Sequence, residues 1–209
     1  MKHVGLILGC SVTAFLASGA ALAEDELHDG FFLRLGLNLG PMMVTQSVDG
    51  LGGTSAEVET GGFSYGYDLL IGGSPVEGLS IGGALVGVNT PDPTRKYGGV
   101  ERTLDGTMLF VGLGAFVNWY FDPEAGGHIQ FLGGFGALDY VSDAGQSGGN
   151  DPTGMFLGFG GGYDFWVSSN WSIGPFGRIL YAPLSAESGS ITVETSTLFP
   201  SIGVSFTYN

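Results

Sequence analysis

Apolar and polar residues alternate with a period of two in eight segments of the chain. Such alternation is typical of β-strands with two different faces. Most of the segments are about 9–11 residues long, the length that a tilted strand needs to cross a bilayer. The eight segments are residues 31–40, 63–72, 79–88, 109–121, 129–137, 155–165, 171–181 and 201–208.

The segment 79–88 is ambiguous. Its alternation changes parity around Gly82 and Gly83, and glycine inside a strand often marks a bulge. We therefore expect a β-bulge at this point.

The two faces of these segments differ in a way that indicates lipid. One face carries large apolar side chains, whereas the other carries glycine, serine and a few charges. This combination is typical of lipid outside a narrow lumen, and lumen glycines are expected opposite Phe116, Phe156 and Phe176. The prediction is an all-β fold: a closed antiparallel eight-stranded transmembrane up-and-down β-barrel. A soluble all-β domain with a glycine-rich core is the alternative.

The connections between the segments alternate in length. Residues 73–78, 122–127 and 168–170 are short and rich in turn-forming residues, while residues 41–61, 89–105, 142–153 and 183–194 are long and polar. Outer-membrane barrels have short periplasmic turns and long extracellular loops. We therefore expect both termini on the periplasmic side.

Aromatic residues gather at the predicted strand ends, where membrane interfaces select them. An outward-facing girdle is expected at the periplasmic ends, and Phe63, Tyr65 and Tyr181 are expected at the opposite rim. The periplasmic girdle comprises Phe31, Trp119, Phe121, Phe131, Phe165, Trp171 and Tyr208.

The N-terminal region has the pattern of a secretory signal peptide. An apolar run at residues 4–16 follows Lys2 and His3, and Ala21-Leu22-Ala23 forms an A-x-A cleavage site. We expect a signal peptide at residues 1–23 and an outer-membrane barrel domain at residues 24–209. The single cysteine, Cys10, falls in the signal peptide, so no disulfide is expected in the mature chain.

The composition favours a membrane protein over a soluble one. Charged residues are 12% of the chain, against about 25% in typical soluble domains, and the mean hydropathy is +0.29. The net charge of −14 argues against nucleic acid as a direct electrostatic partner.

The chain resembles the small outer-membrane barrels of the OmpA transmembrane-domain, OmpX and OmpW types. The glycine-rich barrels of myxobacteria are similar in particular, through Gly161-Gly162-Tyr163-Asp164-Phe165-Trp166-Val167 and Trp171-Ser172-Ile173-Gly174. The resemblance implies a monomer located in the cell outer membrane, with outer-membrane lipids and lipopolysaccharide as partners. It also implies insertion by the barrel assembly machinery, which reads a C-terminal aromatic pattern. Here Tyr208 keeps that pattern, but Asn209 follows it.

Four charged residues, Arg34, Asp68, Asp164 and Arg178, alternate with the apolar positions and are expected in the lumen. Buried charges need partners, and the depth along neighbouring strands predicts a pair between Arg34 and Asp68. Two interpretations stay open: an internal ion-pair network that fills the barrel, or a polar path that conducts small solutes.

We expect no catalytic residue, no metal site and no cofactor. Both histidines of the predicted mature chain, His28 and His128, are placed near the periplasmic turns, away from the extracellular rim where barrel enzymes keep their nucleophiles.

The long loops are acidic, and their basic residues, Arg95, Lys96 and Arg102, form one cluster that could contact lipopolysaccharide phosphate. The expected function is non-enzymatic, with a structural or surface-loop interaction role. The alternative is a narrow channel for small solutes or hydrophobic compounds.

Overall fold

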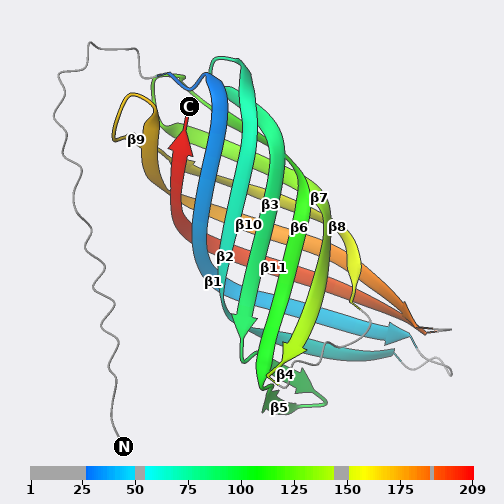
Figure 1. The fold of residues 1–209 in the computed structure, drawn as a ribbon. Helices are drawn as coiled ribbons and strands as arrows, with labels where there is room; N and C mark the ends of the chain where they lie inside the picture. The colour runs from blue at the N-terminus through cyan, green and yellow to red at the C-terminus, as the bar shows by residue number, and fades with distance from the viewer. Residues whose placement is uncertain (1–26, 50–54, 144–150, 189–190) are drawn as a thin grey trace, which may run out of the picture.

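The computed structural model describes residues 27–49, 55–143, 151–188 and 191–209, and its regular structure there is entirely β (Figure 1). No helix among these residues is long and apolar enough to cross a bilayer. The strands are β1 (Gly30–Asp49), β2 (Ser55–Val76), β3 (Leu79–Pro91), β4 (Thr94–Tyr97), β5 (Val100–Thr103), β6 (Gly106–Tyr120), β7 (Gly127–Ser142), β8 (Thr153–Tyr163), β9 (Phe165–Trp166), β10 (Trp171–Ser188) and β11 (Ile191–Tyr208).

Eight of the strands form a closed ring. The hydrogen-bonded order is β1-β11-β10-β8-β7-β6-β3-β2, and β1 also pairs with β2, which closes the sheet on itself. All of these pairings are antiparallel. The short hairpin β4–β5 extends the sheet beyond β2, and β9 pairs with β10. The predicted closed antiparallel eight-stranded barrel is confirmed.

Several regions that the sequence suggests are long loops continue the strands as paired hairpins, so that expectation is wrong. The β1–β2 register runs without a break to Asp49 opposite Ser55, and the β10–β11 register runs to Ser188 opposite Ile191. The polar composition of these segments reflects their position beyond the apolar band, where side chains meet water on the outside of the barrel while the backbone stays paired. These hairpins extend one end of the barrel far past the other strands (Figure 1).

The bulge expected at Gly82 and Gly83 is also absent from β3. The β3–β6 register is continuous from Leu79 opposite Trp119 to Pro91 opposite Thr107. The irregularity lies instead between Gly73 and Val76 of β2. The apparent change of parity has a simple cause: Val86 and Val88 face a part of the lumen that is filled by apolar side chains, so both faces of β3 are apolar there.

The short turns and both ends of the described chain meet at one end of the barrel (Figure 1). The backbone N–H of His28 donates to Pro123 O, and that of Gly78 donates to His28 O. At the C-terminus, the N–H of Asn209 donates to Asn170 O. We call this end the turn end and the opposite end the hairpin end. The predicted signal peptide, residues 1–23, lies outside the described residues.

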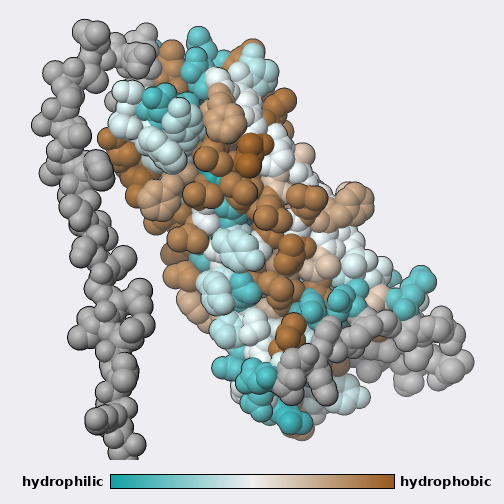
Figure 2. Space-filling view, in the orientation of Figure 1, coloured by the Kyte–Doolittle hydropathy of each residue, from teal (hydrophilic) through white to brown (hydrophobic). Residues whose placement is uncertain are grey.

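The inward and outward faces separate as the alternation predicts. Large apolar side chains point outward around the barrel, for example Leu113 (68% exposed), Phe135 (72%) and Ile202 (75%). They form an apolar band between hydrophilic ends (Figure 2). Inside, glycines make room for aromatic rings, since a Cβ on Gly112 would lie 2.6 Å from the ring of Phe156.

Candidate functional site

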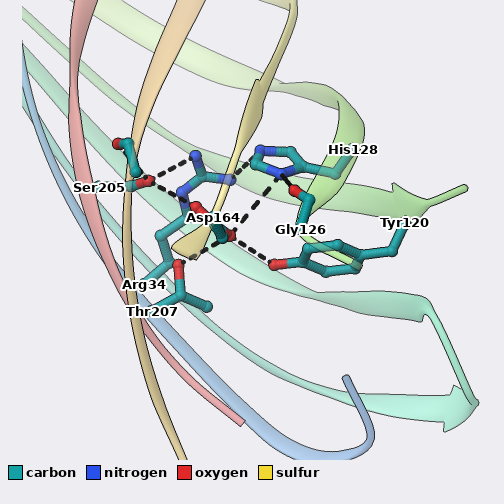
Figure 3. Close-up of polar contacts among 8 residues, drawn as sticks. Arg34, Tyr120, Gly126, His128, Asp164, Ser205 and Thr207 are labelled. Carbon is teal, nitrogen blue, oxygen red and sulfur yellow. Dashed lines mark hydrogen bonds and ion pairs between the residues drawn. The ribbon is translucent and has the colours of Figure 1, made fainter. Parts of the chain in front are cut away.

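The lumen holds a buried polar group near the turn end, which we call the inner polar cluster: Arg34, Tyr120, His128, Asp164, Ser205 and Thr207 (Figure 3). Asp164 lies at its centre, between β8 and β9. Its carboxylate accepts hydrogen bonds from the Tyr120 hydroxyl at 2.8 Å, from Ser205 Oγ at 3.1 Å and from Thr207 Oγ1 at 3.4 Å. Charge-assisted hydrogen bonds of this kind compensate for the loss of water around a buried carboxylate.

Arg34 reaches the same cluster from β1. Its Nη1 donates to His128 Nε2 at 2.9 Å, and its Nη2 donates to Ser205 Oγ at 3.0 Å. A guanidinium has only donors, so His128 Nε2 must be an acceptor here. The ring proton is then on Nδ1, which donates to Gly126 O at 3.1 Å. Four strands and a turn are therefore joined by one polar network.

His28 lies over the inner polar cluster as a lid. Its ring stacks on Tyr120 with centroids 3.4 Å apart and on Trp166 with centroids 4.6 Å apart. Burial lowers the pKa of His28 from 6.5 to about 4, so the ring is neutral at pH 7. The segment before β1 thus closes the lumen at the turn end with a neutral aromatic stack.

A buried ion pair lies farther along the lumen. Arg178 Nη2 is 3.1 Å from Asp68 Oδ2, and both side chains are at most 2% exposed. Asn38 Nδ2 also donates to Asp68, at 3.4 Å. The expected pair between Arg34 and Asp68 is therefore wrong, because equal depth on neighbouring strands does not say which long side chain crosses the lumen to the carboxylate.

Phe176 lies between the two charged groups of the lumen. The guanidinium carbon of Arg34 is 5.2 Å from its ring centroid, and that of Arg178 is 5.7 Å from it. These are cation–π distances. The structure thus places all four predicted lumen residues inside the barrel, in two separate groups: Arg34 and Asp164 belong to the inner polar cluster, and Arg178 pairs with Asp68.

Toward the hairpin end large apolar side chains fill much of the lumen, beside the buried hydroxyl groups of Ser64, Thr90 and Thr197. Phe110, Phe156, Leu180 and Phe199 are fully buried there, and Phe110 and Phe156 meet edge to face with centroids 5.8 Å apart. Beyond this packing lies a cavity of 370 Å³, the mouth cavity. It is lined by Val44, Gln46, Thr60, Arg95, Leu104, Met108, Leu138, Asp139, Tyr140, Asp151 and Pro152.

The inner polar cluster is built for cohesion and not for nucleophilic attack. Ser205 is fully buried, and its Oγ is engaged with Arg34, Asp164 and Gly174 O. His128 uses both ring nitrogens for Arg34 and Gly126, so it is not oriented as a base toward a serine. Among the described residues, no three His, Cys, Asp or Glu side chains gather in a way that could hold a metal ion.

The structure places the predicted girdle residues on the outer face near the turn end. Six of these side chains are exposed, and Tyr208 is half-buried. The centroid of the Tyr208 ring lies 6.2 Å from that of Phe31 and 5.2 Å from that of Trp171. Sequence reasoning did not assign His28, Tyr120, His128 and Trp166 to the polar network of the lumen. Strand parity could have found two of them, since Tyr120 and His128 share the inward parity of their neighbours Asn118 and Gln130.

No family model matches the chain, and no curated protein is similar to it in sequence. Solved structures are similar in fold. The outer membrane protein OprG from Pseudomonas aeruginosa is 10% identical, with 89% of this chain and 100% of that chain covered and a TM-score of 0.54. The outer membrane protein AlkL, solved in lipid bilayers, is 13% identical, with 91% and 95% covered and a TM-score of 0.51. The chain has the fold of the small eight-stranded outer-membrane β-barrel proteins.

Proposed function

We propose that this protein is a non-enzymatic integral barrel of the outer membrane that strengthens the envelope and presents its hairpins at the cell surface. The observation that carries the proposal is the apolar outer band around a ring of paired strands whose interior is packed with side chains. An exposed apolar surface of this extent is unfavourable in water and favourable in lipid. Paired strands leave no open edge in the bilayer.

The proposed orientation places the turn end in the periplasm and the hairpins outside. Short turns on the side of the termini support it, since barrels of this class insert with their termini in the periplasm. The proposed partners are outer-membrane lipids and lipopolysaccharide around the barrel, and the barrel assembly machinery during insertion. We propose a monomer, because closure of the ring needs no second chain.

Conductance and labelling test this proposal. Purified protein in a planar lipid bilayer should show near-zero current, because the inner polar cluster and the apolar packing fill the lumen. A cysteine replacing Tyr97 should react with an impermeant maleimide on intact cells, whereas one replacing Glu124 should react only after lysis. A steady open-channel current would contradict the sealed lumen, and labelling of the second cysteine on intact cells would contradict the orientation.

A second function, uptake of small hydrophobic compounds, is favoured by the mouth cavity and the aromatic side chains that pack below it. An apolar molecule that enters this cavity meets Met108 and Leu138 before the ring of Phe110. The pair of variants Phe110→Ala and Phe156→Ala should then increase the flux of an aromatic hydrocarbon into proteoliposomes. Equal flux for the parent, both variants and protein-free liposomes would leave only the structural role.

A further inference from the structure

The paired strands at the hairpin end carry their glutamates on the outer face of the wall. Glu59 alternates with Thr60, which is buried and lines the mouth cavity, and Glu194 alternates with the buried Thr195. Among the described residues, the glutamates in outward positions at this end are Glu57, Glu59, Glu101, Glu187 and Glu194. The outer surface of the hairpins is therefore acidic.

The β4–β5 hairpin divides its basic residues between the two faces. Lys96 lies on the outer face and forms an ion pair with Glu101 at 2.6 Å, so its charge is compensated there. Arg95 lies on the inner face, where it lines the mouth cavity and its Nε donates to Thr60 Oγ1 at 3.4 Å. Arg102 is directly opposite Arg95 in the register, and residues paired in this way share a face. Two guanidinium groups therefore face the mouth of the barrel.

The mouth cavity next to these guanidinium groups has largely apolar walls. Val44, Met108 and Leu138 are buried side chains that line it. Its volume of 370 Å³ lies within the range of small-molecule pockets, about 300–1,000 Å³. Asp139 and Asp151 line the β7–β8 side, where burial and the adjacent Asp139 carboxylate raise the pKa of Asp151. The cavity is thus cationic on its β4 side, with apolar walls between this side and the two aspartates.

We propose that the mouth cavity binds a free organic acid with one carboxylate and an apolar body, such as a medium-chain fatty acid. The inference deepens the second proposed function, on which its role in uptake rests, because it names the class of compound that enters. The carboxylate accepts hydrogen bonds from Arg95 and Arg102, whose planar donors match its two oxygens. The apolar body displaces water from the apolar walls, which is favourable in proportion to the area buried.

The geometry favours a free acid over the phosphate of a lipopolysaccharide. The acyl chains of that lipid lie in the leaflet, outside the apolar band, whereas Arg95 and Arg102 face the inside of the ring. Lys96 does face the surrounding lipid, but Glu101 already neutralises it. A concave surface with positive charge inside an acidic outer wall attracts anions from the medium to its interior.

Matched charge variants on the same hairpin test the inference. The double variant Arg95→Gln with Arg102→Gln removes both guanidinium groups from the inner face, and Lys96→Gln is the control that removes a positive charge from the outer face. The proteins would be placed in nanodiscs and titrated with octanoate by isothermal titration calorimetry, with empty nanodiscs as the blank. The double variant should weaken octanoate binding at least about tenfold, as expected for loss of charge-assisted hydrogen bonds, and Lys96→Gln should leave it within about twofold of the parent.

Three further ligands separate the contributions of the head and the body. Octanol and octylamine should bind the parent more weakly than octanoate does, because they lack the anion, and acetate should bind more weakly because it lacks the apolar body. Equal loss of octanoate binding in Lys96→Gln, tighter binding of octylamine or octanol, or acetate binding as tight as that of octanoate would each overturn the inference. Loss of octanoate binding in nanodiscs that contain lipopolysaccharide would assign the arginines to its phosphates instead.

The calorimetric result is independent of the tests of the proposed function. Both ends of the barrel are accessible in a nanodisc, so an inverted orientation in cells would not change the affinity for octanoate. An absence of hydrocarbon flux in proteoliposomes would contradict uptake and leave the binding site in place. Absence of octanoate binding by the parent would overturn the inference and leave the structural role of the barrel untouched.

Discussion

The ion pair between Asp68 and Arg178 should be among the most sensitive points in the barrel. Replacing Asp68 with asparagine keeps the volume but removes the charge that neutralises Arg178. The Arg178 side chain is 1% exposed, and its Nε and Nη1 have no hydrogen-bond acceptor among the described residues. The variant would therefore keep an uncompensated cation in a low-dielectric lumen. Breaking one side of a buried ion pair typically costs about 3–5 kcal/mol of unfolding free energy.

A double-mutant cycle separates this pair from the one that the sequence suggests. Arg178→Met together with Asp68→Asn should recover much of the loss, with a coupling free energy of at least about 2 kcal/mol, because residues in one ion pair are coupled. Arg34→Met is the control, since Arg34 contacts His128 and Ser205 instead. Its effect should add to that of Asp68→Asn within about 0.5 kcal/mol, as expected for sites without a shared partner.

The assay is reversible urea unfolding in lipid vesicles, followed by tryptophan fluorescence, with the fraction folded checked by the faster migration of unheated protein on gels. A larger coupling of Asp68 to Arg34 than to Arg178 would refute the pairing in the lumen. A single variant as stable as the parent would mean that water reaches the Arg178 guanidinium.

Three other regions of the barrel give further predictions. Between pH 6.5 and 4 the unfolded chain takes up a proton that buried His28, with a pKa of about 4, does not; the contribution of His28 to stability is therefore largest above pH 6.5 and falls toward pH 4. His28→Phe should keep the stacking and reduce the slope of unfolding free energy against pH in this range, and an unchanged slope would exclude His28 as a contributor. Tyr120→Phe removes the 2.8 Å hydrogen bond to Asp164 and should lower stability in the same urea assay by about 1–3 kcal/mol; no loss would mean that water replaces the hydroxyl. Gly112→Ala places a Cβ 2.6 Å from the ring of Phe156 and should lower stability by about 1–3 kcal/mol. The added change Phe156→Leu should recover part of that loss, unless the lumen has spare room.

The alternation of side chains determined the class of fold. The ring strands place large apolar side chains outward at every second position and alternate them with mostly small, polar or tightly packed side chains inward, and this period of two is one that only an extended backbone satisfies. The short turns are equally local, because glycine, proline and aspartate specify them through their own dihedral preferences. Parity alone also placed Arg34, Asp68, Asp164 and Arg178 on the inward face.

The partners of those residues were decided by the tertiary structure. Arg178 and Asp68 come from strands that are not hydrogen-bonded to each other, and Arg34 meets His128 across the lumen from a position 94 residues away. Such contacts depend on how the closed ring sets the depth of each strand and on which rotamer crosses the interior, and neither is encoded in the local pattern. The same holds for the outward glycines: Gly161 and Gly177 are ordinary strand glycines in the sequence, and they lie side by side only because the register of β8 and β10 brings them opposite each other.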